Sequence, residues 1–204
     1  MSMVMTTSSL MRRAYAGNVM FKDDNYRKNR NGHEVVSADR KALVRALDQL
    51  GDLDFDSTDE ADTKKIYNTV NAYLDVYNNT VSSATNSGSS QIARTGKQMR
   101  ALMKEYEDQL KDIGIDIKSD GTVRINTTEL KKATTRQVSK IFGNDDYINE
   151  MNHLMKKLRN QVNRYSVSDT TGSAQTGKNA DKTATTKIDS LVSETAGSNL
   201  NLYV

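Results

Sequence analysis

Three aspartates at alternate positions, Asp52, Asp54 and Asp56, have the spacing that comes nearest to a metal site. They match the first, third and fifth positions of an EF-hand calcium loop. The sixth position is Ser57 where glycine is needed, and the twelfth is Thr63 where a bidentate glutamate is needed. We therefore interpret this acidic segment as the start of a helix. Ser57 and the glutamate three residues after it can form a capping box, and acidic side chains favour the helix dipole there.

No other group of residues has the spacing of an active site. The two histidines, His33 and His153, are far apart, and neither has a second metal ligand at a usual spacing. Gly88 and Gly96 lack the strand-to-helix context of a phosphate-binding loop, and no serine occupies a nucleophile elbow. The sequence therefore predicts a protein that is not an enzyme and that needs no cofactor or metal.

Tyr67, Tyr73 and Tyr77 follow helical steps and could form a stacking platform for nucleic-acid bases. Tyrosines at this spacing more often lie at the edge of a core, with the hydroxyl in water. No clustered basic groove accompanies them in the sequence, so we interpret them as core-edge residues.

Composition limits the function further. The chain has 204 residues, and its 29 Lys and Arg against 26 Asp and Glu give a net charge of +3, which is no argument for a nucleic-acid partner. Cysteine is absent, which excludes disulfides and thiol chemistry. No apolar stretch is long enough to span a bilayer. A hydrophobic content of 36% and a mean hydropathy of −0.71 predict that part of the chain contributes nothing to a core.

Segments with apolar residues at steps of three and four predict amphipathic helices over residues 37–50, 58–81, 92–113 and 146–165. A small polar linker, Ser82–Gln91, joins the second to the third and predicts an antiparallel pair. Proline is absent, so nothing forces a break in these helices. The predicted fold is mainly α: an elongated bundle of about four helices over residues 37–165 with one small β-hairpin and flexible termini.

The stretch Leu110–Gly143 carries the most local detail. Gly114 follows the third predicted helix where a C-cap residue with positive φ belongs. Alternating apolar residues then predict a β-hairpin over residues 115–125, turning at Gly121. Asn126, with a glutamate three residues later, predicts a capped helix that ends at Gly143.

This stretch resembles the C-terminal region of the bacterial flagellar filament cap protein, hook-associated protein type 2. In that family a long helix ends in an Ile-Gly-Ile turn, and a hairpin around Asp-Gly and a short helix with an apolar stop follow. The matching positions are Leu110, Ile113, Gly114, Ile115, Asp120, Gly121, Val123, Leu130, Ala133, Val138, Ile141 and Phe142. Residues 72–81 are similar to the family's aromatic helix. The resemblance covers roughly residues 60–165 and implies a reduced form without the family's outer domains.

The two ends of the chain differ from the predicted bundle. Residues 1–36 are polar with isolated apolar side chains, which predicts a flexible N-terminal segment. A basic run within it, residues 22–30, could contact nucleic acid or an anionic surface, although such runs are more often solvated. Residues 166–187 predict a disordered linker. Residues 188–204 form a short apolar tail, which either docks on a partner or folds back on the bundle.

Methionines on the helix stripes and apolar residues of the tail are the expected protein-contact residues, because methionine adapts to varied surfaces. They are Met99, Met103, Tyr106, Met151, Met155, Ile188, Leu191, Val192, Leu202 and Tyr203.

The resemblance implies a structural assembly protein of a bacterial flagellum or related surface appendage. It would be a reduced filament-cap component that docks by helix faces on copies of itself or on other appendage subunits. It would lie outside the cell or in the flagellum, exported with a signal that is not cleaved. Two alternatives remain open: a cytoplasmic helical adaptor or secretion chaperone that binds a partner helix, and a nucleic-acid-binding module that uses the basic N-terminal segment.

Overall fold

The computed structural model describes residues 5–16 and 27–172, with side chains described as far as Arg164. The chain divides into two compact units, Met1–Val167 and Ser168–Val204. The disordered linker expected at 166–187 is helical over residues 166–172, where α9 continues, so the prediction is wrong there. Its remaining residues and the expected tail at 188–204 lie outside the described residues. Everything below concerns the first unit.

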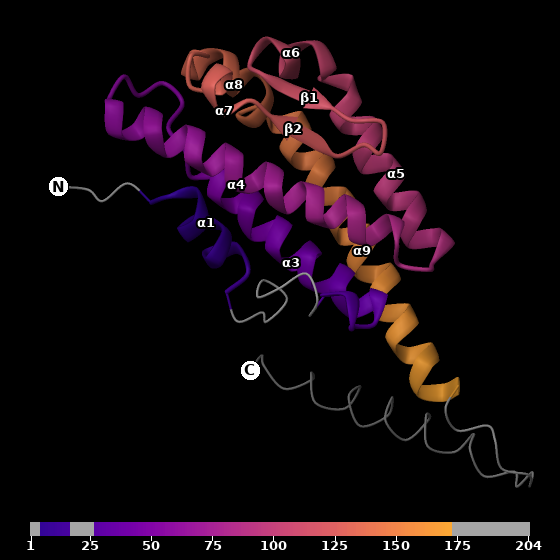
Figure 1. The fold of residues 1–204 in the computed structure, drawn as a ribbon. Coiled ribbons are helices and arrows are strands. Elements are labelled where there is room, and N and C mark those ends of the chain that lie inside the picture. Colours follow the sequence, from indigo (N-terminus) through magenta and orange to yellow (C-terminus); the bar gives the residue numbers. More distant parts are fainter. Residues whose placement is uncertain (1–4, 17–26, 173–204) are drawn as a thin grey trace, which may run out of the picture. The chain divides into compact units, whose positions relative to one another are not determined.

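The fold is mainly helical with one small antiparallel hairpin, as the sequence predicts (Figure 1). Four long helices form the bundle: α3 (Gly32–Gly51), α4 (Glu60–Thr85), α5 (Ser90–Glu105) and α9 (Asp145–Gly172). The shorter elements are α1 (Thr7–Ala14), α6 (Glu107–Asp112), β1 (Ile115–Ile117), β2 (Val123–Ile125), α7 (Thr127–Leu130) and α8 (Thr135–Phe142). No described helix is long and apolar enough to cross a membrane.

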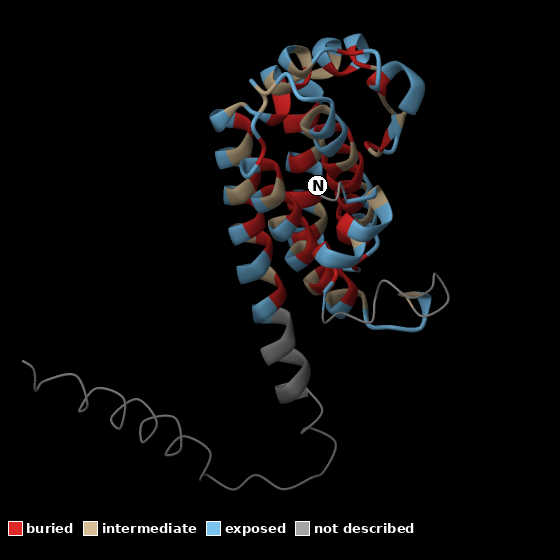
Figure 2. Ribbon diagram, turned by 90° about the vertical axis from the view of Figure 1, so that its left-hand side faces the viewer, coloured by how far each residue is buried: buried red, intermediate tan, exposed pale blue. Residues whose placement is uncertain are grey.

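Helix α4 lies at the centre of the packing. It contacts α1, α3, α5, α8 and β2, and its buried residues cover most of its circumference rather than one stripe. Figure 2 shows buried residues on the inward sides of the helices around it. The fully buried Tyr73 and Tyr77 lie on α4, so the prediction that these tyrosines sit at the core edge is wrong.

The predicted linker between the second and third helices is mostly helical. Helix α4 continues to Thr85 and α5 begins at Ser90. The hydroxyls of Thr80 and Thr85 are satisfied within the helix, because each donates to the carbonyl four residues back at 2.8 Å. Small side chains also let the two helices approach closely, since a Cβ added to Gly96 would lie 3.1 Å from the Ala84 Cβ.

Other helix starts differ from the prediction because different side chains form the caps. Helix α3 begins at Gly32, with Asn31 as its cap, rather than at Ser37. The capping box expected from Ser57 and Glu60 does not form, because the Ser57 hydroxyl donates instead to Asp62 Oδ2 at 2.7 Å. Helix α9 is capped by Asn144, whose side chain accepts from the Tyr147 N–H.

Two predicted helices are each broken into two. The helix expected over residues 92–113 is interrupted at Tyr106, where φ is −104° and ψ is 16°, so that α6 starts a new direction. The helix expected after Asn126 stops at Leu130. It restarts at Thr135 because Thr134 and Gln137 form a complete capping box. Neither break needs a proline.

The hairpin lies where the sequence predicts it. Ile115 pairs with Ile125, and Ile117 pairs with Val123. Gly114, which precedes β1, has φ +80°, and Gly121 in the turn has φ +79°. At Gly114 a side chain would also lack room, because an added Cβ would lie 2.5 Å from the Glu129 Cβ.

Gly114→Ala is therefore expected to lower the free energy of unfolding by about 1–3 kcal/mol, since it combines an unfavourable φ with a clash. Gly51→Ala is the matched control, because an added Cβ at Gly51 meets nothing within 4 Å and φ is not positive there. The control is expected to be neutral or slightly stabilising. Urea unfolding followed by circular dichroism measures both. Equal changes in the free energy of unfolding for the two substitutions would contradict the positive φ and the close packing at Gly114.

Candidate functional site

The hairpin is held on the bundle by side chains of α4 that act as a third strand would. Asn78 Nδ2 donates to the Val123 carbonyl at 2.9 Å, and Asn78 Oδ1 accepts from the Val123 N–H at 2.7 Å. The Tyr77 hydroxyl donates to the Gly121 carbonyl at 3.2 Å. A two-stranded hairpin is marginally stable alone, so these contacts fix it to the bundle. In the sequence, Asn78 gives no sign of this role except that it directly follows a residue of the apolar stripe.

The segment after the hairpin is fixed to α4 by a cluster of aromatic rings. Tyr73 packs edge-on against Phe142 at 5.8 Å and Tyr147 at 6.4 Å between ring centroids, and Tyr106 packs edge-on against Tyr147 at 5.3 Å. The Tyr73 and Tyr147 hydroxyls share a buried hydrogen bond of 2.5 Å. Burial raises the pKa of both groups well above the ordinary tyrosine value.

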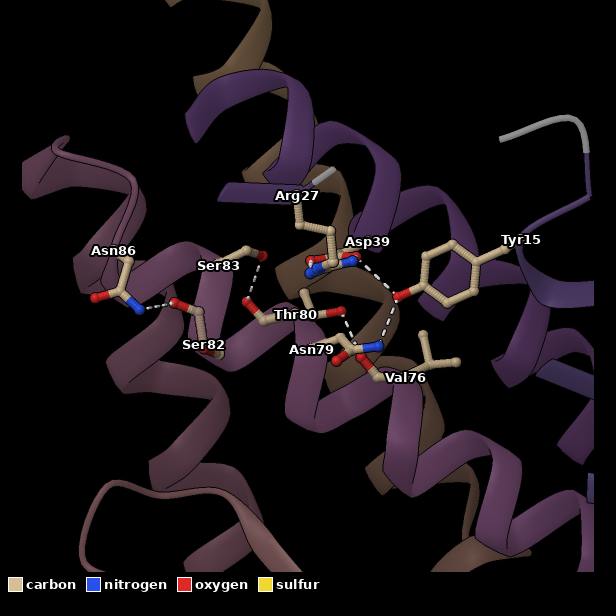
Figure 3. Close-up of polar contacts among 9 residues, drawn as sticks. All are labelled: Tyr15, Arg27, Asp39, Val76, Asn79, Thr80, Ser82, Ser83 and Asn86. Atoms are coloured by element: carbon tan, nitrogen blue, oxygen red, sulfur yellow. Dashed lines mark hydrogen bonds and ion pairs between the residues drawn. The ribbon is translucent and has the colours of Figure 1, made fainter. Parts of the chain in front are cut away.

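A buried carboxylate joins the N-terminal segment to the bundle. Asp39 is fully buried on α3 and accepts from Arg27 through both oxygens, at 2.8 and 2.6 Å (Figure 3). The Tyr15 hydroxyl donates to Asp39 at 2.8 Å, and Asn79 of α4 donates to Tyr15 at 3.1 Å. Burial opposes the charge of Arg27, but the hydrogen bonds and attraction of Asp39 outweigh it and raise the Arg27 pKa.

Residues 5–16 also receive donors from both central helices. Arg45 of α3 donates to the carbonyls of Ala14 and Ala16, at 3.0 and 2.7 Å. Asn68 of α4 donates to the Met5 carbonyl at 3.0 Å. Leu10, Ala14 and Tyr15 are buried and α3 begins at Gly32, so the expected flexible segment at 1–36 is corrected for residues 5–16 and 27–36. The sequence signal that was missed is Asp39 itself, which falls on the apolar stripe of α3 between Val36 and Leu43.

The expected interface methionines are inside the molecule. Met99, Met103, Met151 and Met155 are all at most 1% exposed and belong to the core of the chain itself, so they offer no surface to a partner in this fold. Tyr106 is half-buried against Tyr147. Helical periodicity indicates that a face is buried, but it does not say whether the same chain or a partner packs against it. The prediction that these stripes are docking faces is therefore wrong. The tail candidates Ile188, Leu191, Val192, Leu202 and Tyr203 lie outside the described residues.

The described surface has little apolar area to offer. Met5 is the one large hydrophobic side chain that counts as exposed there, at 36%. A protein partner of this part of the chain would therefore meet polar and charged side chains.

One open cleft of about 610 Å³ lies between the start of α4 and the start of α8. Its lining is rich in hydroxyl groups and includes Phe55, Asp56, Ser57, Tyr67, Thr134 and Arg136. Several polar groups of the lining bond within the protein: Ser57 to Asp62, Tyr67 to the Ala133 carbonyl, Thr134 to Gln137, and Ser139 to the Arg136 carbonyl. The lining contains no histidine, lysine or cysteine that could act as a base or nucleophile beside these hydroxyls.

The remaining sequence candidates do not converge. His33 is half-buried in the first turn of α3, and His153 is exposed on α9, as expected for a surface residue. The described residues contain no group of three or more His, Cys, Asp or Glu that could hold a metal ion. Comparisons with protein families, with curated proteins and with solved structures find no match for this chain.

The buried tyrosines predict a loss of stability at alkaline pH. Burial raises the pKa of Tyr15, Tyr73, Tyr77 and Tyr147 above 10.0, whereas in the unfolded chain each would ionise near pH 10. The contribution of these four tyrosines to stability is therefore fully present below about pH 10 and is lost above it, because only the unfolded state releases these protons. Phenolate absorbance of these four tyrosines should rise in one cooperative step together with the loss of helical circular dichroism. Their gradual titration in a folded protein would contradict their burial.

Asp39→Ala is expected to lower the free energy of unfolding by about 3–5 kcal/mol, because it leaves Arg27 and the Tyr15 hydroxyl without their acceptor. Glu34→Ala is the control, because its 3.6 Å pair with Arg30 is exposed on both sides. Its expected cost is below about 1 kcal/mol. Chemical denaturation measures both, and limited proteolysis shows whether residues 5–31 detach first. A similar, small cost for both variants would contradict the role of Asp39.

Proposed function

We propose that this chain is a structural assembly protein. In our proposal it is a reduced component that resembles the inner helical region of the bacterial flagellar filament cap protein, and it works by binding other protein subunits. The proposal extends to its place: the flagellum or a related surface appendage, reached through flagellar-type export.

The observation that carries the proposal is the unit from α6 to α8. A helix ends before Gly114 at positive φ, a three-residue hairpin turns at Gly121, and a short helix ends on the buried Phe142. This is the order that the resemblance implies. The unit is fixed to α4 through Asn78, Tyr77 and Tyr73. Its hydrogen bonds and rings serve to hold elements together, which supports a structural role.

The mode of docking differs from the first expectation. Since the methionine stripes are covered within the chain, subunits would meet through polar and charged helix faces of the described unit. Such contacts are wetter and more sensitive to salt than apolar ones.

The alternative is a cytoplasmic helical adaptor or secretion chaperone that binds a partner helix. The open cleft beside α8 favours it, since it is the concave feature described on this surface. An adaptor would remain in the cytoplasm and would copurify with one partner.

The deciding experiment follows the protein in its cell of origin. Cytoplasm, surface appendages and medium are fractionated with the flagellar export gate intact and then disabled. Appearance outside the cell only with a working gate is the expected result. Retention in the cytoplasm in both strains would overturn the flagellar proposal and leave the adaptor.

A further inference from the structure

A band of positive charge crosses α3, α5 and α9 in the half of the bundle where α5 begins. Helix α9 lies beside α5, because Thr95 donates to Gln161 at 2.9 Å and Lys157 donates to Gln98 at 2.8 Å. On the other side of α9, Arg159 lies close enough to Arg40 of α3 to lower the pKa of Arg40. The basic band consists of Arg40, Arg94, Lys156, Lys157 and Arg159.

No acidic side chain neutralises this band within the described part of the chain. Residues 76–104 and 151–164 contain no Asp or Glu at all. None of the described ion pairs involves a residue of the band. Partial burial lowers the pKa of Arg40, and the neighbouring charge of Arg159 lowers it further. Like charges held together at this spacing raise the free energy of the isolated chain and favour an anionic partner.

The opposite charge gathers at the other end of the same bundle. Residues 52–62 contain six acids and no base: Asp52, Asp54, Asp56, Asp59, Glu60 and Asp62. All of them except Asp62 are exposed. We call residues 52–62 the acidic loop. Asp54 and Asp62 accept hydrogen bonds from Asp56 N–H and the Ser57 hydroxyl. None of the described ion pairs involves an acid of the loop, and the bases beside it are Lys64, Lys65 and Arg136, which lines the same cleft as Asp56.

The two charged regions cannot neutralise each other within one chain. The acidic loop leads into the first residue of α4, whereas Gly96 of α5, next to the band, packs against Ala84 near the last residue of α4. Helix α4 has 26 residues and is about 39 Å long. Arg40, the band residue nearest to the loop along the chain, precedes Asp52 by twelve residues, which is about 18 Å along α3. Figure 1 shows the start and the end of α4 at opposite ends of the bundle. At physiological salt, charges farther apart than about 8 Å are largely screened.

We propose that the basic band binds the acidic loop of a second copy of this chain, so that copies associate head to tail. The contact is heterologous, because each copy offers a different surface at each end. Repetition therefore gives an open filament or, where the rotation closes, a ring. This inference deepens the proposed assembly function and rests on it for the expectation that copies associate.

The test uses charge reversal in the full-length chain. The band variant carries Lys156→Glu and Arg159→Glu, and the loop variant carries Asp54→Lys and Asp56→Lys. Sedimentation velocity at low salt should show that the native protein associates, and that each variant alone associates about ten-fold more weakly or less. A mixture of the two variants should form one-to-one pairs, because the band variant keeps a native acidic loop and the loop variant keeps a native basic band. Raised salt should dissociate the native protein and the mixture alike.

The matched control is Lys118→Glu with Lys131→Glu, which makes the same change in net charge at exposed residues away from the band. It should associate as the native protein does. Circular dichroism confirms that every variant is folded.

Three results would overturn the proposal. A native protein that stays monomeric at low salt at every concentration would remove head-to-tail pairing of copies but leave assembly with other subunits, which the fractionation experiment tests. Association that neither reversal weakens would remove the charged contact but leave the assembly function. Binding of duplex DNA by a monomeric protein, lost in the band variant and unchanged in the loop variant, would assign the band to nucleic acid instead.

Discussion

The rest of the described fold depends on the contacts that helix α4 makes on every side, both apolar packing and hydrogen bonds. Its apolar residues pack against α1, α3, α5 and α8. Its polar residues supply hydrogen-bond partners to neighbouring elements that would otherwise have none. Asn78 completes the ladder of the hairpin, Asn79 donates to the Tyr15 hydroxyl, and Asn68 donates to the Met5 carbonyl. A buried polar group without a partner is costly, so these side chains determine which elements can lie where.

The second constraint is the burial of Asp39. A carboxylate without exposure needs donors of its own, and α3 supplies none at that position. Tyr15 and Arg27 bring those donors from the N-terminal part of the chain, on either side of α3 in space (Figure 3). The polar N-terminal segment is therefore held by hydrogen bonds and one ion pair as much as by its few apolar side chains.

The apolar side chains of the described unit are buried within the chain itself. Any docking surface on this unit would therefore consist mainly of charged and polar side chains. Segregation of those charges follows from the antiparallel order of the helices. The C-terminal part of α3 and the start of α4 meet at one end, and the start of α5 meets the basic half of α9 at the other. A chain whose net charge is only +3 thus has two strongly charged regions of opposite sign. Charges separated in this way can fix the orientation of one subunit relative to the next, and they contribute less to the affinity for a single anion.

The sequence by itself determined the helical class, the position of the hairpin, and the positive φ at Gly114 and Gly121, because periodicity and turn chemistry act over a few residues. It placed the apolar stripes correctly but could not say what covers them, so Met99 and Met151 were taken for a partner's surface. It missed the breaks at Tyr106 and Lys131, because a helix ends there through ring packing and a competing cap rather than through proline or glycine. Only the tertiary structure decided that Asp39 is buried, that residues 5–16 belong to the core, and that the charges separate. Each of these depends on contacts between residues distant in the chain, and local patterns carry no information about such pairs.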